Sequence, residues 1–87
     1  MTPEQTKLAR HALGLEHGRA RSYRNRYLAP AGGEIEAAWS GLVAAGLAER
    51  GAGTRTGVWF CLTRAGAEAV LRPGESLDPE DFPALAA

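Results

Sequence analysis

The sequence has almost no cysteine and no long hydrophobic run. Cys61 is its only cysteine, so no disulfide can form within the chain. No apolar run approaches the roughly 18 residues that a membrane-spanning helix needs. The N-terminus also lacks the basic start and apolar core of a signal peptide. We therefore expect a cytoplasmic protein that is neither secreted nor inserted in a membrane.

The residues that build catalytic and metal sites are also scarce. The two histidines, His11 and His17, have a spacing that matches no common pair of metal ligands. Cys61 stands in an apolar stretch, where cysteine is more often a small buried hydrophobe than a nucleophile. The glycine-containing stretch 51–57 is not followed by a helix, as a phosphate-binding loop would be. We expect no enzymatic activity, no bound metal and no cofactor.

A net charge is absent as well, but the charges are unevenly distributed. Ten basic and ten acidic residues cancel, so the whole molecule has no general attraction for nucleic acid or membranes. Residues 1–30 hold six basic and two acidic residues, whereas residues 73–87 hold four acidic residues and no basic one. The chain is therefore polarised from a basic N-terminal part to an acidic C-terminal part.

Three segments carry helical patterns. Residues 3–13 follow Thr2, which forms a capping box with Gln5. Residues 64–71 follow Thr63, another residue type that caps helices well. Residues 34–45 show the clearest helical period. The apolar face of this last segment consists of Ile35, Ala38, Trp39, Leu42 and Val43.

Two further segments favour strands. Residues 47–50 and 57–62 flank a glycine-rich loop, which predicts an antiparallel hairpin. In the second segment, alternation places Val58, Phe60 and Leu62 toward the core and the intervening residues on the other face. Residues 15–33 show neither period, and we expect mostly loop there.

These patterns predict an α+β fold with three helices and a two-stranded antiparallel hairpin. We expect a single domain over residues 1–72, followed by an acidic, loosely ordered tail over residues 73–87. The predicted core consists of Leu8, Ile35, Trp39, Leu42, Val43, Leu47, Val58, Phe60, Leu62 and Leu71.

Residues 19–27, which we call the basic segment, interleave four arginines with two tyrosines. Arginine binds phosphate well and tyrosine rings stack on bases, so this segment is the best candidate for nucleic-acid binding. The candidate residues are Arg19, Arg21, Tyr23, Arg24 and Arg26. In the alternative interpretation, Tyr23, Tyr27 and Leu28 hold a loop against the core. The arginines then stay solvated or pair with the acidic tail.

The predicted helix 34–45 has a second face of small residues. This small-residue stripe consists of Ala37, Ser40, Gly41 and Ala44. Exposed helix faces normally carry long polar side chains, so we expect a cover on this side as well. The cover would be the first helix or a second copy of the chain, which makes the stripe a candidate surface for a protein partner or a homodimer.

Residues 35–71 resemble a known family. Trp39–Arg50 (WSGLVAAGLAER), the glycine-rich loop and Trp59–Gly66 (WFCLTRAG) are similar to the second half of winged-helix domains of the MarR type. There, a helix ending in a Gly-Leu turn leads to a β-hairpin wing and a Leu-Thr-x-x-Gly helix start. The resemblance implies a winged-helix-like fold that binds duplex DNA, with helix 34–45 in the groove and Arg55 at the wing tip on a phosphate.

The whole chain also resembles small uncharacterised prophage-encoded proteins, in its Tyr-Arg-Asn stretch and its Leu-Thr-Arg-Ala-Gly-Ala-Glu-Ala sequence. We therefore expect a small phage-related, winged-helix-like protein that binds nucleic acid without catalysis. Helix 34–45 begins with Glu34 and Glu36, so the arginines of the basic segment are better suited to supply the phosphate contacts.

The alternative is a protein–protein interaction or self-association module of the same fold that does not bind DNA. Convergence of the basic segment and Arg55 on one face would favour nucleic acid, whereas exposure of the small-residue stripe would favour a protein partner. We also expect the acidic tail to lie over the arginines of the basic segment, where a polyanion could displace it.

Overall fold

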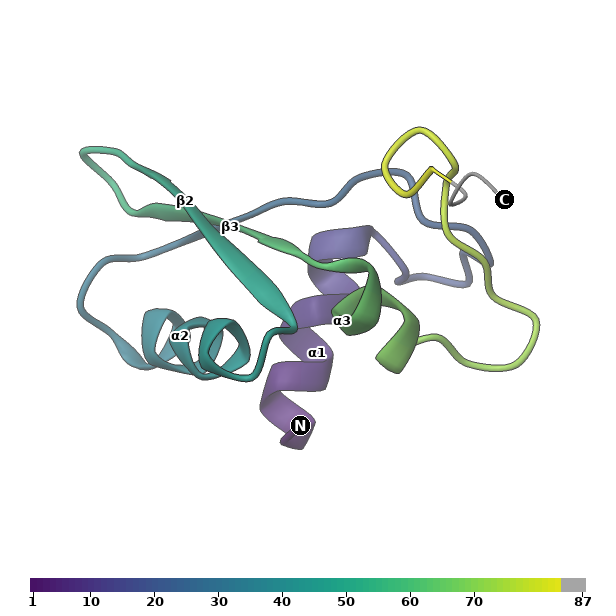
Figure 1. Cartoon of the computed structure of the whole chain (residues 1–87), viewed down its shortest axis with the longest axis horizontal. Helices are drawn as coiled ribbons and strands as arrows, with labels where there is room; N and C mark the ends of the chain where they lie inside the picture. The colour runs from purple at the N-terminus through teal and green to yellow at the C-terminus, as the bar shows by residue number, and fades with distance from the viewer. Residues whose placement is uncertain (84–87) are drawn as a thin grey trace.

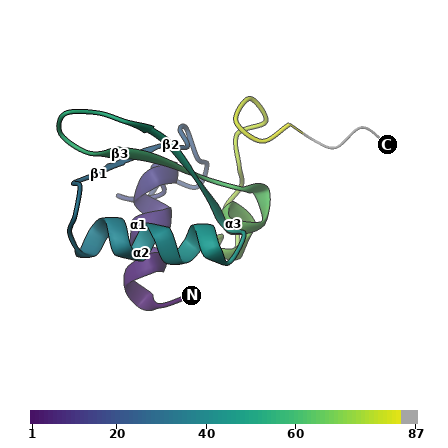
Figure 2. The same cartoon turned by 60° about the vertical axis from the view of Figure 1, so that its left-hand side comes forward.

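The computed structural model describes residues 1–83. Within this range the chain forms three α-helices and one three-stranded antiparallel sheet. The elements in chain order are α1 (Pro3–Leu13), β1 (Tyr27–Ala29), α2 (Glu34–Ala44), β2 (Ala48–Gly53), β3 (Val58–Leu62) and α3 (Arg64–Ala69). The helices lie on one side of the sheet, as Figures 1 and 2 show from two directions. The predicted α+β class is confirmed.

The helices begin where their capping residues predict. At α1, the Gln5 N–H donates to Thr2 Oγ1 (3.1 Å) and the Thr2 N–H donates to Gln5 Oε1 (2.9 Å), which completes the capping box. At α3, the Gly66 N–H donates to Thr63 Oγ1 (3.2 Å). After α2, Gly46 takes a left-handed conformation with φ 76°, and the chain turns directly into β2.

The sheet has three strands rather than the two-stranded hairpin that we predicted. The hairpin is present, since β2 pairs antiparallel with β3. The prediction was wrong about Tyr27–Ala29, which we expected to be loop and which forms β1 on the other side of β3. The Asn25 side chain extends this pairing, because it accepts from the Leu62 N–H (2.8 Å) and donates to the Leu62 carbonyl (2.9 Å). A strand of three residues is too short to show an alternating pattern.

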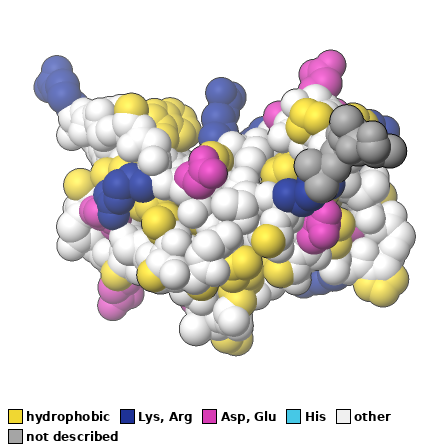
Figure 3. All heavy atoms as spheres, in the orientation of Figure 1, with side chains coloured by type: hydrophobic (Ala, Val, Ile, Leu, Met, Phe, Trp, Pro, Cys, Tyr) yellow, Lys and Arg dark blue, Asp and Glu magenta, His cyan; other side chains and the backbone are white. Residues whose placement is uncertain are grey.

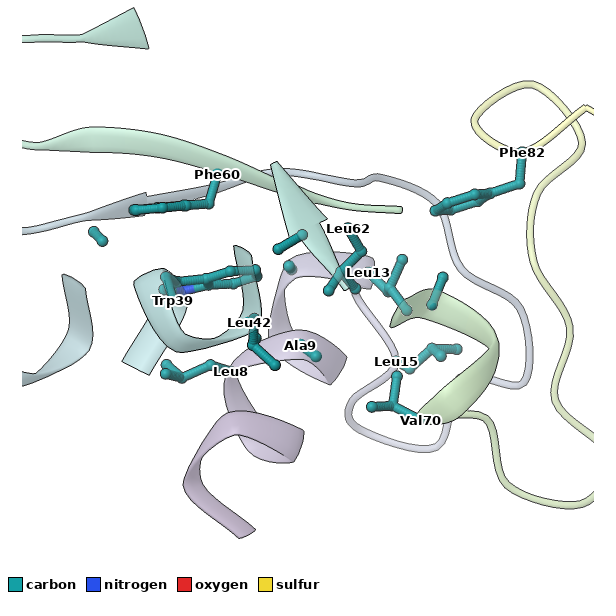
Figure 4. Packing of buried hydrophobic residues seen from close by; sticks show 14 residues of the cluster. Leu8, Ala9, Leu13, Leu15, Trp39, Leu42, Phe60, Leu62, Val70 and Phe82 are labelled. Atoms are coloured by element: carbon teal, nitrogen blue, oxygen red, sulfur yellow. The ribbon is translucent and has the colours of Figure 1, made fainter. Parts of the chain in front are cut away.

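The core lies between the sheet and the helices. Trp39 of α2 stacks beneath Phe60 of β3, with ring centroids 5.4 Å apart and planes 14° apart, and Figure 4 shows Leu8 and Leu42 beside them. All ten predicted core residues lie in this cluster or pack against it. The buried ones are Leu8, Trp39, Leu42, Phe60 and Leu62, and the partly buried ones are Ile35, Val43, Leu47, Val58 and Leu71. Buried residues that the prediction omitted include Leu13, Leu15, Val70 and Phe82.

Residues 73–83 of the predicted tail lie against the domain, and residues 84–87 are outside the described part. Ser76 forms a short parallel bridge with Arg21. The Ser22 N–H donates to the Ser76 carbonyl (3.0 Å), and buried Ser22 Oγ accepts from the Asp78 N–H (2.8 Å). Further on, the Phe82 side chain is 7% exposed. Backbone bonds and one aromatic ring therefore attach this segment.

Arg10 of α1 connects four parts of the chain. Its guanidinium donates to both carboxylate oxygens of Glu75 (2.6 and 2.7 Å), to the Val70 carbonyl (2.8 Å) and to the Leu15 carbonyl (3.1 Å). The side chains of Arg10 and Glu75 are 9% and 12% exposed. The pKa of Glu75 is lowered to about 2, first by the hydrogen bonds from Arg10 and then by the backbone N–H of Arg72. The pair joins α1, the end of α3 and the tail.

Candidate nucleic-acid interface

The outer face of the sheet points away from the helices. Tyr27 and Phe60 are paired and face the core, so the next pair, Leu28 and Trp59, projects from the opposite face. Cys61 and Glu49 form another outward pair beside them. No helix within residues 1–83 covers this face (Figure 1). The outer face therefore presents an apolar strip between β1 and β3 to the surroundings.

A shallow groove of about 330 Å³ runs beside the exposed tryptophan. It is lined by His11, Arg24, Arg26, Tyr27, Leu28 and Trp59. Trp59 is 36% exposed, unlike Trp39, which is fully buried. Two predicted binding residues, Arg24 and Arg26, thus lie beside an aromatic ring on a solvent-facing surface.

The basic segment covers the C-terminal end of α1. The Tyr23 N–H donates to the Leu13 carbonyl (3.1 Å), and the Arg26 N–H donates to the Ala12 carbonyl (3.2 Å). The Arg24 guanidinium donates to the His11 carbonyl (2.7 Å from one terminal nitrogen, 3.3 Å from Nε). Carbonyls at a helix C-terminus lack partners within the helix and carry partial negative charge, so they favour this cation. Arg24 is therefore held in place at the groove.

Tyr23 forms a cluster with two arginines. The guanidinium carbons of Arg19 and Arg24 lie 4.3 and 5.1 Å from its ring centroid. The ring also rests on Gly14, where an added Cβ would lie only 2.1 Å from Tyr23 Cε1. Tyr23 remains 48% exposed, but these neighbours already contact its ring. Its contacts fit the predicted anchoring of the loop better than base stacking.

The remaining predicted residues lie elsewhere. Arg21 is exposed beside Ser76 of the tail, and Arg19 borders a different groove, on the side of Lys7 and Arg72. Arg55 lies in the β2–β3 loop, at the opposite end of the long axis from the tail (Figure 1). On the face seen in Figure 3, lysine and arginine side chains are scattered rather than gathered in one patch. The structure brings only Arg24 and Arg26 together with Trp59.

None of the candidate arginines forms an ion pair within residues 1–83. The ion pairs there are Arg10–Glu75, His11–Glu16, Arg50–Glu36 and Arg64–Glu68. The tail was expected to lie over the basic segment through its charges. It does lie beside residues 20–22, but through backbone hydrogen bonds, and its Glu75 pairs with Arg10 instead. Among the described residues, therefore, no carboxylate neutralises an arginine of the basic segment.

The small-residue stripe of α2 is exposed at three of its four positions: Ala37, Gly41 and Ala44. Ser40 is partly buried and accepts a hydrogen bond from Arg50 (2.9 Å). Of the two covers that we considered, α1 does not lie over this stripe. α1 reaches α2 at this point through Gln5, whose side-chain amide donates to the Ala38 carbonyl (3.1 Å).

The groups with possible chemistry are dispersed. Burial raises the pKa of the Cys61 thiol, and nearby Glu49 raises it further, so the thiol stays protonated and weakly nucleophilic.

In the described part of the chain, no three side chains of the His, Cys, Asp or Glu type gather as metal ligands. None of the helices in residues 1–83 is long and apolar enough to cross a bilayer.

Comparisons with protein-family models, with curated proteins and with solved structures found no match to this chain. The winged-helix and prophage resemblances therefore stay predictions.

Trp59 and Leu28 are two residues of this face to which we assigned no binding role. The alternation of residues 58–62 did place Trp59 opposite the core, and a large aromatic residue on the solvent side of a strand is a usable signal. No sequence pattern pointed to Leu28, because its place on this face follows from the pairing of β1 with β3, which was not predicted.

Proposed function

We propose that this protein binds nucleic acid without catalysis, through the groove beside Trp59. The observation that carries the proposal is the placement of Arg24 and Arg26 along one groove with an exposed tryptophan. Neither arginine is neutralised by a carboxylate within residues 1–83. Guanidinium groups bind phosphates and an exposed indole offers a surface for bases, so the groove combines both contacts that nucleic-acid binding uses.

α2 is a poor candidate for a helix that reads duplex DNA. It contains no basic residue, and Glu34 and Glu36 lie in its first turn. The pKa of Glu36 is lowered, first by the Gly32 N–H and then by Arg50, so its carboxylate keeps its charge. A winged-helix-like arrangement of residues 35–71 is still part of the proposal, supported by the order α2, β2, β3, α3. A relation to phage proteins remains a prediction from the sequence.

A salt titration tests the proposal. We would measure binding of a fluorescent oligonucleotide of mixed sequence to the full chain by anisotropy. We expect the logarithm of the binding constant to fall linearly with the logarithm of the salt concentration, because binding releases counterions from the nucleic acid. Arg26→Gln removes one positive charge. Arg26 is exposed, and its side chain makes no hydrogen bond in the described part of the chain. The substitution should reduce the slope by about 0.7–0.9 if that charge contacts one phosphate.

Lys7→Gln is the matched control, because Lys7 is also exposed and lies on α1 outside the groove. It removes the same charge and should leave the slope nearly unchanged. Equal slopes for the two variants would place the contacts elsewhere, and a wild-type chain that fails to bind at low salt would refute nucleic-acid binding.

The second candidate is a self-association module that uses α2. The exposure of Ala37, Gly41 and Ala44 favours it, because small residues allow close approach of another chain. Sedimentation of the wild-type chain would show a concentration-dependent dimer in that case. Ala44→Lys should then restore the monomer, and this result together with absent nucleic-acid binding would establish the second candidate.

A further inference from the structure

We infer that the nucleic acid bound here is single-stranded and that one of its bases stacks on the indole of Trp59. This inference rests on the proposed function and adds the class of ligand. In a single strand the faces of the bases are accessible, whereas in a duplex they are buried against one another. An exposed indole can therefore contact a base face in the first case and not in the second.

The surroundings of Trp59 leave room for a flat ring. On the β2 side its neighbour is Gly51, where an added Cβ would lie 3.3 Å from the Trp59 carbonyl oxygen and 3.4 Å from Trp59 Cβ. Because Gly51 has no side chain, it does not obstruct the β2 side of the indole. On the β1 side its neighbour is Leu28, an apolar partner directly across the strands. Trp59 thus lies on an apolar strip, between Leu28 on one side and a glycine without a side chain on the other.

The charges around Trp59 define where a phosphate backbone would run. Arg24 and Arg26 border the groove on the β1 side, and Arg24 is already positioned by the His11 carbonyl. Glu49 lies on the outer face on the β2 side and is exposed. Phosphates are therefore favoured along β1 and repelled along β2. Cations on one flank and an aromatic ring in the middle form the combination that sequence-tolerant single-strand binding uses.

α2 and α3 are poorly suited to enter the groove of a duplex. The exposed positions of α2 are Glu34, Ala37, Gly41 and Ala44, which offer one carboxylate and two methyl groups. α3 has only six residues. α2 therefore lacks the exposed basic and amide side chains that contact base edges in the major groove, and α1 exposes a single lysine, Lys7. The sheet face remains as the surface that can contact bases.

Competition between matched oligonucleotides tests the inference. The ligands are a single strand of twelve nucleotides, its duplex, and an abasic single strand of equal length. We expect the full chain to bind the single strand more tightly than the duplex or the abasic strand. Trp59→Ala should weaken single-strand binding about 5- to 150-fold, since loss of one base stack costs about 1–3 kcal/mol. It should leave abasic binding unchanged, and Trp59→Phe should retain most of the affinity.

A second measurement does not depend on a variant. Saturable quenching of tryptophan fluorescence in the wild-type chain by the single strand, but not by the abasic strand, would support stacking, because Trp39 is fully buried. Absence of this quenching would overturn the inference even if Trp59→Ala failed to fold.

The possible failures can be told apart. If Arg26→Gln weakens binding while Trp59→Ala does not, nucleic-acid binding stands and stacking is refuted. Duplex binding as tight as single-strand binding would also overturn the inference and leave the proposed function intact. If no oligonucleotide binds, both are wrong. A change in self-association upon Trp59→Ala would then identify the outer sheet face as a protein interface.

Discussion

Replacing Gly66 with alanine tests how closely α3 packs against the start of β2. Gly66 is buried in α3, and a Cβ at this position would lie 1.9 Å from the Leu47 carbonyl oxygen and 2.8 Å from its carbonyl carbon. The Leu47 backbone cannot move freely, because its N–H donates to the Leu42 carbonyl (2.9 Å) and its carbonyl accepts from the Thr63 N–H (3.1 Å). The added methyl group therefore has to displace α3.

Two effects oppose each other in this variant. Alanine is favoured over glycine inside a helix by about 1 kcal/mol. Overpacking a core costs about 1–3 kcal/mol, and the upper end or more applies where the obstacle is backbone. We expect Gly66→Ala to lower the free energy of unfolding by about 2 kcal/mol. For a chain of this size, each kcal/mol corresponds to roughly 4–8 °C in Tm.

Gly41→Ala in α2 is the matched control. Gly41 is exposed, and its added Cβ would meet only the Gln5 side-chain amide, at 2.9 Å, which can shift by loosening its hydrogen bond to the Ala38 carbonyl. This variant should be neutral or more stable by up to about 1 kcal/mol. Urea denaturation followed by tryptophan fluorescence gives both values. The packing of α3 described above would be wrong if Gly66→Ala were as stable as the wild type.

Two further predictions concern Trp39 and the pair of Arg10 and Glu75. Trp39→Ala should lower the free energy of unfolding by about 3–5 kcal/mol in urea denaturation, because the ring is fully buried; a loss below about 1 kcal/mol would contradict that burial. The pKa of Glu75 falls from 4.5 to about 2 on folding, so its charged form stabilises the fold above pH 4.5 and this contribution disappears as the pH falls through about 2. Urea denaturation should therefore show Glu75→Gln less stable than the wild type by a constant amount near neutral pH, and the difference should shrink on acidification. A difference that grows toward low pH would contradict the ion pair.

The elements with strong local periods were predictable from the sequence. Trp39 and Leu42 mark one face of α2, and Phe60 and Leu62 mark the core side of β3, because burial on one side imposes a period on the residue pattern. β1 has only three residues, and its pairing with β3 joins positions 29 to 33 residues apart. Such a contact leaves no trace in a local pattern. The third strand could therefore not be predicted.

The tail illustrates the same limit. Its acidic composition suggested a solvated segment, but Glu75 pairs with Arg10, 65 positions earlier in the chain. Phe82 was visible as a lone aromatic residue, yet its burial depends on the positions of the other elements. The arginines of the basic segment were predictable from composition. That Arg24 and Arg26 line the groove while Arg19 lies on another side follows from β1 and from the end of α1.

The hydrogen bonds of the Arg10 guanidinium make unfolding more cooperative. The guanidinium bonds to the loop after α1, to the end of α3 and to the tail at once, so none of these parts can open without exposing a buried charge and unpaired carbonyls. The basic segment is attached on one side to α1 and on the other to the tail. α1 and residues 75–78 of the tail therefore belong to one cooperative unit with the arginines that we propose to contact phosphate, and detachment of this part of the tail would loosen the groove beside Trp59.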